Sequence, residues 1–234
     1  SIENPKTYID GNIVAEGGNS YIETVVDESP NHFEANSISI VDIEVPAEEG
    51  NIKVIEAIEG QLITKKLEFK PLIKDNKVIS DTSRDLLKMV VMNRYNFSKP
   101  SVAFIKNFGF KQGAIASTVA HDSHNIIAVG ANDEEIVRAI NLLIKQKGGI
   151  VLCNADDQMI LPLPVAGIMS NNDGFKVAND YEMLEEKAKS LGSNFQAPFM
   201  TLSFMALLVI PELKLSDKGL FDGTTFEFTS LFCK

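Results

Sequence analysis

Two of the three histidines of this chain lie in one tetrapeptide with a carboxylate and a hydroxyl, His121-Asp122-Ser123-His124. Imidazole, carboxylate and hydroxyl groups are the side chains that bind metal ions, activate nucleophiles or move protons near neutral pH. Apolar segments rich in Val, Ile, Ala and Thr flank the tetrapeptide at Ala114–Ala120 and Asn125–Gly130, as is typical of β-strands. We therefore expect a polar loop where two strands end.

The residues leave three roles open for His121–His124. If His121 and His124 bind one metal ion, the tetrapeptide must be a turn, because residues three apart on a strand point to opposite faces. The metal would also need further ligands, and His32 is the one other histidine. A nucleophilic triad would need Ser123 or Ser117 to be activated by a histidine, and no GxSxG motif occurs. In the third role the side chains cap the two strands, or they lie at a substrate edge or a domain interface.

Composition narrows the classes of protein to consider. The 234 residues are 44% hydrophobic and 23% charged, as in a globular chain with one large domain or one domain and a smaller piece. A net charge of -10 without a Lys/Arg cluster argues against nucleic acid as a partner. No apolar run approaches the about 20 residues that span a bilayer, and no signal peptide is recognisable. We expect a cytoplasmic protein without a membrane partner.

Other motifs add little chemistry. Cys153 and Cys233 belong to no CxxC or Cys/His pattern, so reduced thiols are expected. Gly148-Gly149 fits the end of a helix, and the GxGxxG and GxxxxGK[ST] phosphate-binding motifs are absent. The chain begins at Ser1 without Met, as a fragment or a processed product would.

The first 70 residues predict β-structure. Asp10-Gly11-Asn12 is a turn signal for a hairpin between two short strands. Ser37–Val45 alternates over most of its length and predicts a further strand. Lys53–Ile58 and Leu62–Phe69 predict a second hairpin around Glu59-Gly60-Gln61.

Later segments alternate between the two periodicities. The expected helices are one that starts at Ser80–Ser83 and ends near Asn93–Tyr95, one from Asn132 to Gly148, one over Tyr181–Leu191 and one over Phe199–Val209. Further strands are expected at Ser101–Phe108 and Ile150–Asn154 and Gln158–Leu161, with an extended segment at Thr224–Phe232.

The order of these elements predicts the fold class and the domains. Strands and helices come in mixed order rather than in strict βαβ alternation, which favours an α+β fold with a mixed or antiparallel sheet and packed helices. A small all-β segment precedes it. The polar stretch Pro46–Asn51 is the expected boundary between a β-sandwich-like remnant, residues 1–50, and the α+β domain, residues 51–234.

Three long phrases carry a family resemblance. In chain order, they are AFIKNFGFKQGAIASTVAHDSHNIIAVG, GGIVLCNADDQMILPLPVAGIMS and PFMTLSFMALLVIPELKLSDKGLFD. They resemble the C-terminal region of bacterial adenine deaminases, which belong to the amidohydrolase superfamily, and the resemblance covers residues 80–228. Tyr8-Ile9-Asp10-Gly11 and Ile13-Val14-Ala15 resemble the end of that family's small β domain. Asn93-Arg94-Tyr95 departs from the family, where a more basic phrase with a His is expected.

The resemblance implies a function for the complete protein. Adenine deaminases convert adenine and water to hypoxanthine and ammonia in purine salvage, and a hydroxide bound to divalent metal ions of the Mn, Fe or Zn type attacks the purine. The resemblance places those metal ligands in an upstream (β/α) barrel, and this sequence has no HxH motif. We therefore expect that this chain binds no metal and is inactive alone.

The same resemblance suggests roles for this chain beside its catalytic barrel. It would brace the barrel, cover the mouth of the active site or form a homo-oligomer interface. His121 and Asp122 are then the catalytic candidates, and Ser123 and His124 the candidates at the edge of the substrate adenine. The alternative is a stand-alone, non-catalytic binding or assembly module with the same fold.

Overall fold

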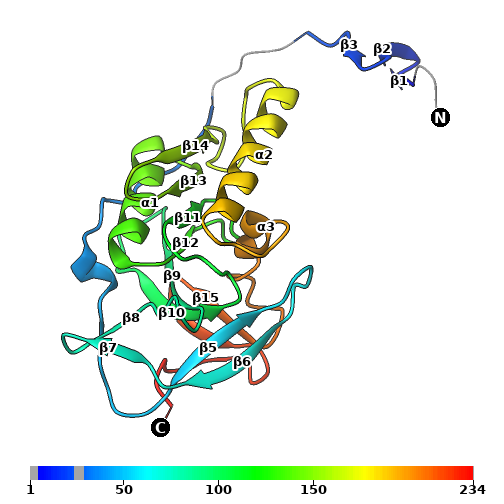
Figure 1. Ribbon diagram of the computed structural model, residues 1–234. Helices are drawn as coiled ribbons and strands as arrows, with labels where there is room; N and C mark the ends of the chain where they lie inside the picture. The colour runs from blue at the N-terminus through cyan, green and yellow to red at the C-terminus, as the bar shows by residue number, and fades with distance from the viewer. Residues whose placement is uncertain (1–4, 24–28, 234) are drawn as a thin grey trace.

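The structure, a computed structural model, describes residues 5–23 and 29–233. Its centre is a large sheet between helices (Figure 1). The strands of this sheet are β5 (Ile52–Ala57), β6 (Thr64–Phe69), β9 (Leu86–Met92), β10 (Ser101–Lys106), β11 (Ala114–Ser117), β12 (Ile126–Gly130), β13 (Gly149–Cys153) and β14 (Gln158–Pro162).

The eight strands lie in the order β14-β13-β11-β12-β9-β10-β5-β6. Neighbouring strands are antiparallel except β10 and β5, which run parallel. The sheet is therefore mixed, and the prediction of an α+β fold is confirmed. The predicted hairpins β5–β6 and β13–β14 and the pairing of β11 with β12 are present as well.

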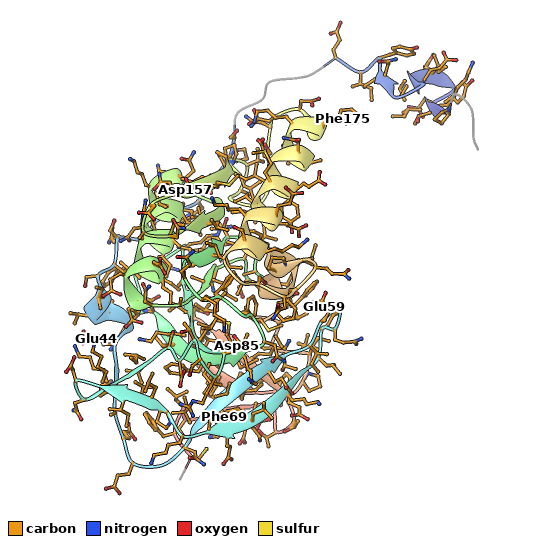
Figure 2. The ribbon with its side chains drawn as sticks, viewed as in Figure 1. Glu44, Glu59, Phe69, Asp85, Asp157 and Phe175 are labelled. Atoms are coloured by element: carbon orange, nitrogen blue, oxygen red, sulfur yellow. The ribbon has the colours of Figure 1, made fainter. Side chains whose placement is uncertain are left out.

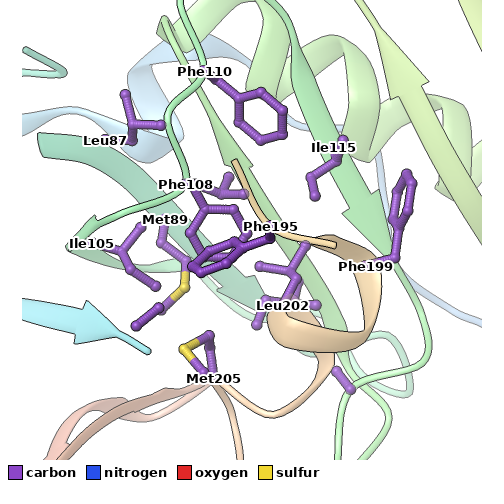
Figure 3. Close-up of a cluster of buried hydrophobic side chains, with 14 of the residues drawn as sticks. Leu87, Met89, Ile105, Phe108, Phe110, Ile115, Phe195, Phe199, Leu202 and Met205 are labelled. Carbon is purple, nitrogen blue, oxygen red and sulfur yellow. The ribbon is translucent and has the colours of Figure 1, made fainter. Parts of the chain in front are cut away.

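Helices cover both faces of the sheet (Figure 1). Helix α1 (Asp133–Gln146) packs on β11, β12 and β13. Helix α2 (Gly174–Ser190), helix α3 (Pro198–Ser203) and strand β15 (Leu213–Ser216) pack on the opposite face. Figure 3 shows this second core, where the ring of Phe108 meets that of Phe195 edge to face at 5.0 Å, near Leu202 and Met205.

Helix α1 agrees with the sequence. Asn132 caps its start, because its side chain accepts a hydrogen bond from the Glu135 backbone N–H at 2.8 Å. Ile136, Ile140 and Leu143 are buried as predicted, and the helix ends before Gly148. The expected position of this helix is confirmed.

The predicted helix over the Leu86 region is wrong, because this segment is the central strand β9. All seven of its residues are buried, and Leu87 and Met89 join the α3 core while Val90 joins the α1 core. A strand buried on both faces is a continuous apolar run, so its alternation is hidden. Lys88 fits there because its Nζ donates to Asp133 Oδ2 at 2.6 Å.

The predicted strand over Ser37–Val45 is also wrong. A short 3-10 helix, η1 (Ile40–Ile43), occupies it, and only Val45–Pro46 forms a strand, β4. The backbone N–H of Ser39 donates to Asp42 Oδ2 at 2.7 Å. Side-chain acceptors therefore satisfy backbone groups that a sheet would otherwise pair.

Two predicted helices differ in length from the observed ones. Helix α2 starts at Gly174 rather than Tyr181, since Asp173 caps it by accepting hydrogen bonds from two backbone N–H groups. Helix α3 ends at Ser203 rather than Val209, and turns follow it. Those turns return the chain to β15.

Three small antiparallel sheets complete the described residues. Their strands are β1 (Lys6–Ile9), β2 (Asn12–Glu16) and β3 (Asn19–Ser20); β4 with β7 (Leu72–Lys74) and β8 (Lys77–Ile79); and β15 with β16 (Gly219–Asp222) and β17 (Glu227–Phe228). The hairpin predicted at Asp10-Gly11-Asn12 is confirmed as β1–β2. Of the extended segment expected at Thr224–Phe232, Glu227–Phe228 is strand.

Two further properties concern the chain as described. Cys153 and Cys233 are free thiols, and burial raises the pKa of Cys153 to about 11. Among residues 5–23 and 29–233, no helix is long and apolar enough to cross a membrane.

Candidate functional site

The polar loop, His121–His124, forms the turn that follows β11 and precedes β12. Asp122 and Ser123 are exposed, while the two histidines are partly buried. The backbone closes the turn with a hydrogen bond of 2.6 Å from the His124 N–H to the Ala120 carbonyl. The expected turn between two strands is therefore present, and its carboxylate and hydroxyl face outward.

His121 is fixed against the segment that contains α3. Its backbone N–H donates to the Ser203 carbonyl at 2.9 Å. Its ring stacks on the ring of Phe204, with centroids 4.8 Å apart and an interplanar angle of 22°. The position of this imidazole thus depends on residues more than eighty positions later in the chain.

His124 is held by its own turn. Its Nδ1 atom accepts a hydrogen bond from the Ala120 backbone N–H at 3.3 Å, which leaves the proton of the neutral ring on Nε2. Burial lowers the pKa of His124, and the nearby His121 and Arg94 lower it further, while Asp122 opposes them. The ring is therefore mostly neutral at pH 7, so Nε2–H is a hydrogen-bond donor.

The fit of a metal ion to these residues can be tested directly. The rings of His121 and His124 meet edge to face, with centroids 5.2 Å apart, and one nitrogen of His124 is occupied by the Ala120 N–H. Within the part of the chain that the structure describes, no group of three or more His, Cys, Asp or Glu side chains is placed to hold a metal. These residues do not fit a metal centre.

Arg94 is a residue of the site that the sequence did not reveal. It is 2% exposed and lies just after β9. Its Nε donates to the His124 carbonyl at 2.6 Å, and its Nη2 donates to the Ala166 carbonyl at 2.7 Å and to the Tyr95 hydroxyl at 2.8 Å. The Tyr95 hydroxyl in turn donates to the Ser123 carbonyl at 3.0 Å. Arg94 and Tyr95 therefore hold the backbone of the polar loop.

The space around Arg94 is fully occupied. Its guanidinium carbon lies 4.4 Å from the centroid of the Tyr95 ring. A Cβ atom at Gly167 would come within 2.5 Å of Arg94 Nη1, and Gly167 has a positive φ of 70°. The sequence offered one signal for this arrangement, a lone Arg in Asn93-Arg94-Tyr95 directly after an apolar run, but the carbonyl acceptors at His124 and Ala166 are distant in sequence.

Comparisons with known proteins identify the family to which this chain belongs. Residues 61–227 match the family described as "Adenine deaminase C-terminal domain". Since the match covers more than half of the chain, the chain belongs to this family, and the resemblance in the sequence is confirmed.

Relatives extend the similarity to nearly the whole chain. An adenine deaminase of Methanosarcina barkeri is 51% identical over 97% of this chain, and those of Salinibacter ruber and Borreliella afzelii are 46% and 43% identical over 97% and 95%. The chain spans only 43%, 42% and 41% of the lengths of these relatives. More than half of each relative therefore lies outside the matched region.

Proposed function

We propose that this chain is the C-terminal domain of a complete adenine deaminase, which hydrolyses adenine to hypoxanthine and ammonia. The observation that carries the proposal is 51% identity to an adenine deaminase over 97% of the chain. The relative's additional length provides room for a catalytic domain, because this chain spans 43% of it. Divalent metal ions would be bound there, since the polar loop does not fit a metal.

The polar loop is the part of this domain that we assign to the mouth of the active site. Asp122 and Ser123 are exposed on a turn whose backbone is fixed by Arg94 and Tyr95, so their side chains are available to a molecule outside this domain. A carboxylate and a hydroxyl can accept hydrogen bonds from the amino and ring N–H groups of a purine. His121 can serve as a proton carrier, because the two nitrogens of an imidazole ring can accept and donate a proton.

Substitutions at His121 in the complete enzyme separate chemistry from packing. His121→Phe keeps an aromatic ring to stack on Phe204 but removes both nitrogens, whereas His121→Ala removes the ring as well. If the imidazole takes part in proton transfer, both variants lose at least about tenfold in kcat for adenine. If His121 only packs, His121→Phe retains the wild-type kcat and His121→Ala loses stability.

The role of the Asp122 carboxylate can be tested against a matched control, Asp156, on the same domain. Asp122→Asn should raise the KM for adenine by roughly tenfold, because a hydrogen bond to a charged group contributes about 1.5–3 kcal/mol. Asp156→Asn, also exposed and in a turn, should leave KM unchanged. Equal KM values for the two variants would remove Asp122 from the substrate edge.

The gene itself tests the wider proposal. An upstream reading frame continuous with Ser1 that encodes an HxH motif supports a complete deaminase. Adenine turnover should then require the complete polypeptide and be absent from the 234-residue chain. A start codon directly before Ser1 would instead support a stand-alone binding or assembly module.

A further inference from the structure

Five exposed or partly exposed apolar side chains lie on two neighbouring segments and are here called the apolar ridge. Four of them are strongly exposed: Leu62 at 43%, Ile63 at 48%, Met200 at 51% and Val209 at 62%. Phe204, which is partly buried, is the fifth. They come from the connection between β5 and β6 and from α3 and the turns after it.

Hydrogen bonds hold these two segments side by side. Lys214 Nζ donates to the Leu62 carbonyl at 2.6 Å and to the Phe204 carbonyl at 3.0 Å. The Thr64 N–H donates to the Pro211 carbonyl at 3.0 Å. Figure 2 shows Glu59 at the tip of the β5–β6 connection, beside the α3 region, where its carboxylate accepts from the Gln196 N–H at 3.2 Å. These hydrogen bonds therefore place the segment of Leu62 and Ile63 beside the segment that holds Phe204 and Val209.

Three of the five ridge residues, Met200, Phe204 and Val209, lie in a stretch of the chain without charge. No Asp, Glu, Lys or Arg occurs between Lys189 and Glu212, although the chain has a net charge of -10. Glu59 and Glu212 lie at its border. An apolar centre with charges only at the border is the usual composition of a protein interface, and exposed apolar patches commonly mark such interfaces.

The ridge is continuous with the polar loop. The ring of His121 stacks on Phe204, a member of the ridge, and the His121 N–H donates to the Ser203 carbonyl. A partner that covers the ridge would therefore also lie next to Asp122 and Ser123. One contact surface can thus serve both packing and the proposed substrate edge.

We propose that the apolar ridge is the docking surface for the part of the complete adenine deaminase that lies outside this chain. The inference rests on the proposed function. Each compared relative has more than half of its length outside the matched region, and that length is joined covalently to this domain. The partner surface must be apolar and largely uncharged, since the ridge offers it no ion pairs.

Methionine oxidation tests the docking without any substitution. Met200 of the ridge and Met183 of α2 are exposed to nearly the same degree, 51% and 49%. Dilute hydrogen peroxide should oxidise both to the sulfoxide at similar rates in the 234-residue chain, because exposure governs the rate. In the complete polypeptide, we expect Met200 to react at least about tenfold more slowly while Met183 is unchanged, as measured by mass spectrometry.

Each other outcome has a defined meaning. Equal oxidation of Met200 in the complete polypeptide and in the isolated chain overturns the docking. Protection of Met200 in the isolated chain that increases with its concentration identifies a second copy as the occupant and also overturns it. Adenine turnover measured on the same samples tests the proposed function separately, because a protected Met200 without turnover contradicts only the function.

Discussion

Arg94 Nε donates a hydrogen bond of 2.6 Å to the carbonyl oxygen of His124. Through Nη2 the same guanidinium binds the Ala166 carbonyl and the Tyr95 hydroxyl. It therefore joins the end of the central strand, the polar loop and the segment before Gly167. A charged group that is 2% exposed is stabilised only while these acceptors stay in place.

Replacing this residue should loosen the domain and the loop together. Arg94→Lys keeps the charge but loses the planar arrangement of donors, so at least one of the buried carbonyls is left without a partner. We expect the free energy of unfolding to fall by about 2–4 kcal/mol, as measured by urea denaturation of the isolated chain.

Arg138 provides the matched control for this prediction. It also donates three hydrogen bonds, to Asn154, Ala155 and Gln158, but it is only partly buried on α1. Arg138→Lys should cost less than about 1 kcal/mol, because water can replace its partners. A loss at Arg94 as small as that at Arg138 would contradict the role of Arg94 as the residue that holds the polar loop.

Several elements of the fold could be predicted from sequence, because the signals that define them are local. The turns that bound β1 and β2, the cap Asn132 and the alternation in β5 each act within a few residues of the chain. The polar loop was recognised for the same reason, since a dense polar cluster between two apolar strands stands out in one short stretch.

The features that could not be predicted from the sequence depend on contacts between residues that are far apart in the chain. The sequence predicts a helix where β9 lies, because a strand that is covered on both faces shows no strand periodicity. Arg94 could not be assigned, since its acceptor in Ala166 is 72 positions away. The contact between His121 and Phe204 likewise exists only after α3 has packed on the sheet.

Burial of Lys214 should make the free energy of unfolding increase as pH rises from 8 to 10.5. It is 0% exposed, and burial lowers its pKa to about 8 from the model-peptide value of 10.5. The neutral amine still has two N–H donors, which match the carbonyls of Leu62 and Phe204. The unfolded chain binds more protons than the folded chain between pH 8 and 10.5, so the contribution of Lys214 to stability rises across this range, by about 3 kcal/mol.

A comparison with Lys214→Met isolates this contribution from the other groups that titrate in base. The free energy of unfolding of the wild type, measured by urea denaturation, should increase relative to that of Lys214→Met as pH rises from 8 to 10.5. A difference that stays constant with pH would show that Lys214 titrates alike in the folded and unfolded chains.

Val209 allows a substitution that acts only through the docking surface. It is 62% exposed, so Val209→Glu should change the free energy of unfolding of the isolated chain by less than about 0.5 kcal/mol. In the complete polypeptide the same glutamate would be buried against an apolar partner without an ion pair, which is costly. We expect a lower melting temperature there and faster oxidation of Met200.

Met183→Glu is the control, because Met183 is also exposed and apolar but lies on α2, outside the ridge. It should leave the melting temperature and the oxidation of Met200 unchanged in both polypeptides. If Val209→Glu destabilised the isolated chain as much as the complete one, its effect would come from packing within this domain. The ridge would then be a part of the domain's own surface that no partner covers.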